Sequence, residues 1–166
     1  MNDLFEAWRS ARPPYYDLKY KEILMKEFAD YGARSKDIKA FETAYELYIY
    51  AFFVGLYNNE KKPISKKENS YGHKIEFWGN KAGKKFRKDF SILQKYIFVA
   101  LVSKTDVDFL ALEKGDISID SVVSSLMETM EQYANGGINL IREKFEDNES
   151  FFFTPTGFLN FILKSE

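Results

Sequence analysis

The segment IDSVVSSLMETMEQYANGGINLIREKF, residues 119–145, decides the fold of this chain. Apolar residues recur along it at the three- and four-residue spacing of one helix face. Asn135, Gly136 and Gly137 interrupt the pattern but leave it in phase, although each glycine costs about 1 kcal/mol relative to alanine in a helix. We therefore expect one long helix that is kinked, or closely approached by another helix, at the glycines. The stripe consists of Ile119, Val122, Leu126, Met130, Tyr133, Gly137, Leu140 and Lys144, with Ile141 and Phe145 alongside.

Helical periodicity extends over most of the remaining chain. A short N-terminal helix with an apolar face of Leu4, Phe5 and Trp8 ends before Pro13-Pro14, because proline restricts the residue before it and donates no amide. The sequence predicts an all-α fold, a single-domain helical bundle of five to seven helices over residues 1–166. Further helices are expected at about residues 17–31, 36–57, 84–104 and 105–115, with a last helix from Thr154.

Capping residues predict where several of these helices begin and end. Asp17 can accept hydrogen bonds from the first amides of the second helix, and Gly32 suits its left-handed C-terminal position. Thr105 followed by Asp108 matches a capping box with aspartate in the glutamate position. Thr154 followed by a proline is the best-specified helix start in the chain.

Two segments are apolar on all sides, which is typical of buried helices. They are LYIYAFFVGLY at 47–57 and YIFVALV at 96–102. The longer one has eleven residues, whereas a bilayer core requires about 20, so we expect no membrane span. No segment clearly predicts a strand, although Lys74–Trp78 alternates and could form a short extended piece.

The composition excludes several classes of function. The 166 residues include 24 Lys and Arg, 25 Asp and Glu, one His and no Cys. These counts exclude a polycation, disulfides, thiol catalysis and a metal site of several histidines within one chain. The N-terminus lacks the layout of a signal peptide. We therefore expect a cytoplasmic protein.

The exception to the helical pattern is NNEKKPISKKENSYGHKIEFWGN, a long irregular basic loop at about residues 58–80. Loops beyond about 12–15 residues without secondary structure are uncommon in compact domains and are usually functional or disordered. Residues 61–89 carry seven more basic than acidic side chains, and residues 104–166 carry seven more acidic than basic ones. The near-zero net charge therefore conceals a dipolar chain, and this asymmetry bears on its partners.

The basic, aromatic-containing segment 61–88 is the predicted partner surface. Lysines neutralise phosphates and aromatic rings stack on bases where proteins bind single-stranded nucleic acid. The same amines could meet an acidic protein, including the acidic half of a second copy. They could also be solvated while Ile75, Phe77 and Trp78 pin the loop to the bundle. The candidate binding residues are Lys61, Lys62, Lys66, Lys67, Tyr71, His73, Lys74, Trp78, Lys81, Lys84, Lys85, Arg87 and Lys88.

Other constellations of polar residues predict no catalytic residue, metal or cofactor. One acidic cluster lacks the spacing and the internal glycine of a calcium-binding loop. It consists of Asp106, Asp108, Glu113 and Asp116. Its aspartates stand early in a predicted helix, where a negative charge complements the helix dipole. His73 could act as a general base near neutral pH, but no nucleophile stands at a motif spacing from it. An enzyme with a site assembled around His73 remains the second alternative.

Two further patterns fall short of known catalytic motifs. GNKAGKK at 79–85 departs from the GxxxxGK[ST] spacing of a phosphate loop. The glutamate pairs 128/131 and 143/146 lie one helical turn apart, where carboxylates are usually solvated rather than facing each other across a cleft. Neither pattern predicts a catalytic site.

Three stretches resemble small uncharacterised bacterial proteins associated with DNA-modification or anti-phage gene clusters. They are YGHKIEFWGN at 71–80, VSKTDVDFLALEKGD at 102–116 and METMEQYANGGINLIREKFEDN at 127–148. The resemblance implies an accessory subunit that acts beside larger enzymes, and it carries no catalytic residue over. We therefore expect a non-enzymatic helical interaction module in a larger bacterial assembly, with a protein partner. Nucleic-acid binding by segment 61–88 is the alternative.

Overall fold

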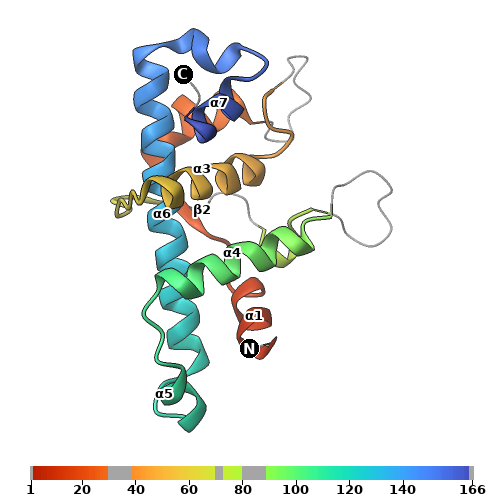
Figure 1. The fold of residues 1–166 in the computed structure, drawn as a ribbon, viewed down its shortest axis with the longest axis vertical. Helices are drawn as coiled ribbons and strands as arrows, with labels where there is room; N and C mark the ends of the chain where they lie inside the picture. Colours follow the sequence, from red (N-terminus) through yellow and green to blue (C-terminus); the bar gives the residue numbers. More distant parts are fainter. Residues whose placement is uncertain (1, 30–38, 70–72, 80–88, 165–166) are drawn as a thin grey trace. The chain divides into compact units, whose positions relative to one another are not determined.

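A computed structural model describes residues 2–29, 39–69, 73–79 and 89–164 of the chain. The chain divides into two compact units. The first unit comprises residues 1–15 and 69–131, and the second comprises residues 16–68 and 132–166. The described residues form seven α-helices and two strands of three residues, so the all-α class predicted from the sequence is confirmed (Figure 1).

Helix α1 (Asn2–Arg9) opens the first unit and buries the face predicted for it. Leu4 and Trp8 are 3% and 0% exposed. The ring of Phe98 lies 5.6 Å from that of Trp8 and 5.3 Å from that of Phe5. The helix ends before the proline pair, as the sequence predicts, because a proline cannot continue its hydrogen bonding.

Helix α4 (Ser91–Lys104) begins later than predicted. Residues 84–88 lie outside the described part of the chain, and residues 89 and 90 are not helical. Oδ1 of Asp89 accepts a hydrogen bond of 2.9 Å from the Ser91 amide at the first turn. The expectation that residues 96–102 are buried on all sides is wrong, because Tyr96 and Val99 are largely exposed.

A short turn and a short helix also belong to the first unit. The predicted extended piece at residues 74–78 is instead a 3-10 turn at Ile75–Phe77. Helix α5 (Phe109–Lys114) is capped by Asp108, whose Oδ1 accepts from the Ala111 amide at 2.8 Å. The predicted cap at Thr105 is wrong, because that hydroxyl donates to Oγ1 of Thr129 at 3.0 Å instead.

The second unit begins with a broken helix rather than the continuous one predicted for residues 17–31. A 3-10 turn at Leu18–Tyr20 and a π-helical turn at Lys21–Met25 precede helix α2 (Lys26–Phe28). Asp17 does cap the start, as predicted. Its own strand β1 (Tyr15–Asp17) pairs with β2 (Lys67–Asn69) in a two-stranded sheet that the sequence did not predict. The predicted end at residue 32 lies outside the described residues.

Helix α3 (Ala44–Asn58) starts later than the predicted residue 36, because a capping box fixes its first turn. The Thr43 hydroxyl accepts from the Glu46 amide at 3.3 Å, and the Glu46 carboxylate accepts from the Thr43 amide at 3.2 Å. Together these bonds satisfy two amides that would otherwise lack partners. Within the described residues, no helix is long and apolar enough to cross a membrane.

Helix α6 (Ile119–Asp147) is the long vertical helix in Figure 1 and continues through the glycine pair. In the second unit α3 crosses it there: a Cβ on Gly137 would overlap the Ala51 carbonyl oxygen, and one on Gly55 would overlap that of Tyr133. The predicted close helix–helix approach is therefore confirmed. Glycine is required at the crossing because the two backbones leave no room for a side chain.

The chain ends in a 3-10 turn at Glu149–Phe153 and helix α7 (Gly157–Leu163). The predicted start at Thr154 is wrong, because its hydroxyl donates to the Phe151 carbonyl oxygen at 2.9 Å and the helix begins three residues later. Aromatic rings join these elements to α2 and α6. Phe28 lies 5.1 to 5.9 Å from four rings, those of Phe145, Phe152, Phe153 and Phe158.

Candidate functional site

The first part of the predicted basic loop, residues 59–66, is held to the second unit by a buried carboxylate. Asp17 is 1% exposed. Its Oδ2 accepts from the Ser65 amide at 2.9 Å and from the Ser65 hydroxyl at 2.7 Å, and its Oδ1 accepts from the Lys19 amide at 3.3 Å. Because these donors are backbone amides and a hydroxyl, the hydrogen bonds use no lysine ammonium group, although the charge of Lys19 also acts on Asp17.

Asn135 on α6 extends this contact along the loop. Its Nδ2 donates to the carbonyl oxygens of Lys62 and Pro63 at 3.2 and 3.1 Å. Its Oδ1 accepts from the Asp17 amide at 3.3 Å. Asn135 is fully buried, and buried amides of this kind are normally satisfied by such bonds. The loop backbone therefore lies against α6 through paired polar groups.

Hydrogen bonding lowers the pKa of Asp17. Burial alone would raise that pKa, since it disfavours the charged form. The hydrogen bonds from the Ser65 hydroxyl, the Ser65 amide and the Lys19 amide, together with the charge of Lys19, favour the carboxylate, and the net result is a pKa below the ordinary value for aspartate. Asp17 is therefore ionised at neutral pH and gives the loop a charged anchor.

Four exposed lysines lie on or beside this anchored part of the chain. We call Lys19, Lys61, Lys66 and Lys67 the lysine surface. The Leu18 amide donates to the Lys66 carbonyl oxygen at 2.8 Å, which brings Lys19 next to the loop. The ammonium of Lys19 lies 4.9 Å from the ring centroid of Tyr20, and that of Lys61 lies 4.9 Å from the ring centroid of Tyr133.

The remaining sequence candidates behave differently. Lys62 is half-buried and its Nζ lies 3.9 Å from Oε1 of Glu60, so part of its charge is balanced within the chain. Trp78 is 2% exposed, so its ring cannot stack on a base, and its prediction as a binding residue is wrong. Lys74 is half-buried and His73 is exposed. The other candidates lie outside the described residues: Tyr71, Lys81, Lys84, Lys85, Arg87 and Lys88.

Three of the carboxylates considered for chemistry have structural roles. Glu131 is 4% exposed and pairs with the guanidinium of Arg12, and it also accepts from the Tyr15 amide at 2.8 Å. Glu143 accepts from Nδ2 of Asn139 at 2.7 Å. Asp108 caps α5. Across the described part of the chain, no three His, Asp or Glu side chains gather closely enough to hold a metal ion.

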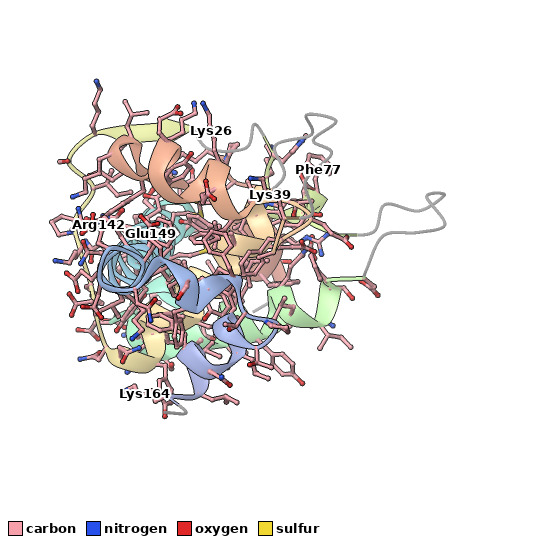
Figure 2. All side chains as sticks on the ribbon, turned by 90° about the horizontal axis from the view of Figure 1, so that it is seen from above. Lys26, Lys39, Phe77, Arg142, Glu149 and Lys164 are labelled. Atoms are coloured by element: carbon pink, nitrogen blue, oxygen red, sulfur yellow. The ribbon has the colours of Figure 1, made fainter. Side chains whose placement is uncertain are left out.

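A second polar cluster lies on the face of α6 that meets the first turns of the second unit. The Tyr20 hydroxyl donates to Oδ1 of Asn139 at 3.1 Å, and Arg142 (Figure 2) donates to the same oxygen at 3.1 Å. Burial raises the pKa of Tyr20 to about 12. The phenol is therefore protonated at neutral pH and acts as a hydrogen-bond donor, not as a base.

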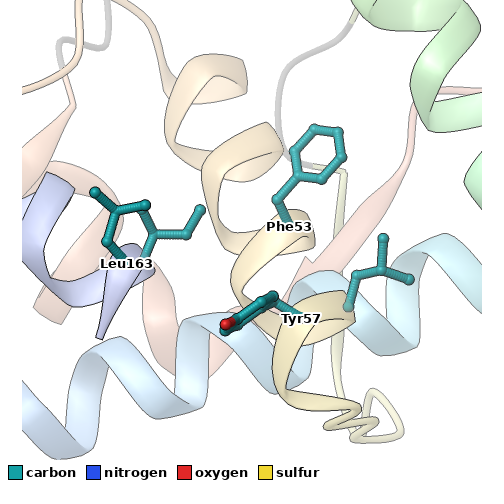
Figure 3. A pocket seen from close by; sticks show the side chains of 5 residues that line it. Phe53, Tyr57 and Leu163 are labelled. Atoms are coloured by element: carbon teal, nitrogen blue, oxygen red, sulfur yellow. The ribbon is translucent and has the colours of Figure 1, made fainter. Parts of the chain in front are cut away.

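An apolar groove lies between α3 and α7 in the second unit. Its volume is about 390 Å³. Figure 3 shows Phe53 and Tyr57 on α3 and Leu163 on α7 among its lining residues, which also include Leu56 and Ile162. These five side chains offer hydrocarbon and aromatic surface, and none of them is charged. The groove can therefore hold apolar groups, and the Tyr57 hydroxyl is the one polar group among these five side chains.

Two contributors to this site, Lys19 and the anchor Asp17, are not among the binding residues predicted from the sequence, which gives Asp17 only as a helix cap. Both are distant from the loop along the chain, and their placement depends on hydrogen bonds that join separate segments. Asn135 is evident from the sequence only as part of a helix interruption. Its burial beside a loop is a tertiary feature that helical spacing does not signal.

Comparison of the chain with protein-family models, with curated proteins and with solved structures finds no match in any of the three. No relative found in this way therefore indicates a function for the chain.

Proposed function

We propose that this protein is a non-enzymatic interaction module that binds an acidic protein partner through its lysine surface. The observation that carries the proposal is the way this loop is held. Asp17 binds Ser65, and Asn135 binds the carbonyl oxygens of Lys62 and Pro63. These contacts use backbone and hydroxyl groups of the loop, which leaves the ammonium groups of Lys61 and Lys66 available to carboxylates outside the chain. A surface held in place before binding loses less conformational entropy on association.

Protein carboxylates are favoured over nucleic acid as the target. Binding to single strands commonly combines basic side chains with exposed rings on which bases stack. The buried ring of Trp78 cannot serve in this way, and the Tyr20 and Tyr133 rings beside Lys19 and Lys61 are buried too. Among the described residues, the rings that lie beside Lys19 and Lys61 are therefore not open to stacking, which favours carboxylates as the partner of these ammonium groups.

The proposal places the protein in the cytoplasm as an accessory subunit of a larger bacterial assembly. The cysteine-free composition supports that compartment. The resemblance of residues 71–80, 102–116 and 127–148 to proteins of DNA-modification or anti-phage gene clusters supports the accessory role. Among the described residues, none is in hydrogen-bond or ion-pair contact with His73, so a site assembled around it has less support.

A binding titration with defined probes tests the proposal. Fluorescent poly-L-glutamate represents an acidic protein segment, and fluorescent oligo-dT represents single-stranded nucleic acid. The variant K19Q/K61Q/K66Q/K67Q should lose about ten- to a hundredfold in affinity for poly-L-glutamate, because four charge contacts are removed. The control K26Q/K95Q/K114Q/K164Q removes the same charge from exposed lysines elsewhere and should bind nearly as well as the wild type.

Three results would overturn the proposal: equal losses in both quadruple variants, no binding of poly-L-glutamate at low salt, or tighter binding of oligo-dT than of poly-L-glutamate. The last result would support the nucleic-acid alternative. In that case the affinity should fall steeply and linearly with the logarithm of the salt concentration.

A further inference from the structure

Helix α4 carries an exposed apolar ridge. Ile92, Tyr96 and Val99 are 63%, 64% and 63% exposed. They are spaced by four and three residues, so they lie on one face of the helix. The opposite face is buried through Ile97, Phe98 and Leu101. This helix therefore has two apolar faces, and contiguous exposed apolar surface of this kind marks an interaction site more often than single exposed residues do.

The charges at the two ends of α4 indicate what covers the ridge. Asp89 is exposed two residues before the start of the helix, and its carboxylate accepts a hydrogen bond from the Ser91 amide at the first turn. Lys104 is exposed at the last residue of the helix. A second α4 packed antiparallel places each Asp89 near the other copy's Lys104. A parallel arrangement instead places like charges together, which is unfavourable.

The spacing of the ridge fits a two-fold axis. Ile92 and Val99 are equally distant from a point between residues 95 and 96, so an antiparallel copy centred there sets each Ile92 against the other copy's Val99. The same register puts Asp89 of one copy opposite residue 102 of the other copy. Lys104 of that other copy lies two residues further on, about 3 Å along the helix axis. A lysine side chain can span this distance. Lys95 lies at the edge of the ridge, where its long side chain can turn its amine to solvent.

We propose that α4 is the contact of a symmetric homodimer, in which two copies of this chain pack antiparallel through Ile92, Tyr96 and Val99. A two-fold contact is self-complementary and closes after two subunits. The proposed dimer contact uses residues of the first unit and none of the lysine surface. The outcome of its test is therefore independent of whether the proposed function is correct.

Sedimentation across a concentration series tests the dimer. The wild type should show a reversible monomer–dimer equilibrium. V99E should raise the dimer dissociation constant by about a hundredfold or more, because it places a charge in an apolar contact. L159E is the matched control, since Leu159 is 56% exposed on α7, and it should dimerise like the wild type. Circular dichroism should show unchanged helix content in both variants, because both side chains are exposed.

A charge swap tests the antiparallel register. D89K and K104D should each raise the dissociation constant about three- to thirtyfold, because both end contacts become repulsive. An equimolar mixture should recover wild-type affinity, since the D89K subunit is basic at both ends of α4 and the K104D subunit is acidic at both ends. A monomeric wild type at every concentration, a dimeric V99E, or a mixture no better than the single variants would overturn the proposal.

Discussion

Asp17 and Ser65 lie 48 residues apart in the chain and are joined by two hydrogen bonds, from the Ser65 amide at 2.9 Å and from the Ser65 hydroxyl at 2.7 Å. These two hydrogen bonds help to fix the first part of the irregular loop, residues 59–66, in one position. Asn135 supports it by binding the carbonyl oxygens of Lys62 and Pro63. The local order of the loop therefore depends on two buried side chains, the carboxylate of Asp17 and the amide of Asn135.

Replacing Asp17 with asparagine should lower the free energy of unfolding by about 1–3 kcal/mol at pH 7. The substitution keeps an oxygen acceptor but removes the charge, and hydrogen bonds to charged groups contribute more than neutral ones. Urea denaturation at pH 7 measures the change. The exposed pair Glu22–Lys26 in the same unit offers a control, because E22Q should change stability by less than about 0.5 kcal/mol. A D17N protein as stable as E22Q would show that the anchor contributes little.

The Asp17 anchor should also make stability pH-dependent. Its pKa lies below 3.8 in the folded protein, so the folded state binds this proton less readily than the unfolded chain does. The contribution is therefore fully present above the pKa of the unfolded aspartate and is lost as the pH falls through the lower pKa of the folded state. Subtracting the D17N pH profile from that of the wild type isolates the effect. A flat difference curve would contradict the lowered pKa.

Replacing Gly137 with alanine should destabilise the second unit by about 3 kcal/mol, despite the better helix propensity of alanine. The added methyl group meets the backbone oxygen of Ala51, and two packed helices must separate to admit it. S124A serves as the control, since Ser124 is exposed on α6 and its replacement should change stability by less than about 0.5 kcal/mol. Equal stabilities of the two variants would show that the crossing is looser than described.

Removing the Thr43 hydroxyl by T43A should cost about 1 kcal/mol, because the α3 capping box loses one of its two bonds. Thermal or urea unfolding measures the loss. T43S keeps the hydroxyl and should restore most of the stability. Should T43S be as unstable as T43A, the methyl group rather than the cap would be responsible.

Removing Arg12 by R12M should destabilise the first unit by about 1–3 kcal/mol. Its guanidinium pairs with the Glu131 carboxylate, whose side chain is 5% exposed, and a buried carboxylate without its partner is unfavourable. The double variant R12M/E131Q should recover part of the loss, because the uncompensated charge disappears. A double-mutant cycle by urea denaturation gives the coupling, and a coupling near zero would contradict this account.

Much of the fold follows from periodicity. The stripe from Ile119 to Phe145 predicts α6, and its phase across Gly137 predicts a kink or a close helix–helix approach, of which the structure shows the close approach. Helix starts are harder to predict, because several residues compete for each cap. The Thr43–Glu46 box is a local signal that marks the start of α3 better than the periodicity does. Thr105 fails as a cap because its hydroxyl binds Thr129, which local sequence cannot reveal.

The candidate site is predictable only in part. The charge of segment 61–67 is evident from the sequence, but its anchor is not, since Asp17 and Asn135 reach it from distant positions. Periodicity also cannot separate a buried apolar face from an exposed one, and this is why the apolar run of α4 predicts burial on every side. The burial of Trp78 could not be predicted for a similar reason. An aromatic residue in a loop is compatible with a role in the core and with a role on a binding surface, and the local sequence does not distinguish the two.

Lysine acetylation footprinting tests the lysine surface most directly. Mass spectrometry of the wild-type protein, treated with a limiting acetylating reagent with and without poly-L-glutamate, reports the protection of each lysine. Lys19, Lys61, Lys66 and Lys67 should be protected, whereas Lys95, Lys114 and Lys164 should react equally in both samples. Protection spread evenly over all exposed lysines, or confined to the second group, would contradict the account.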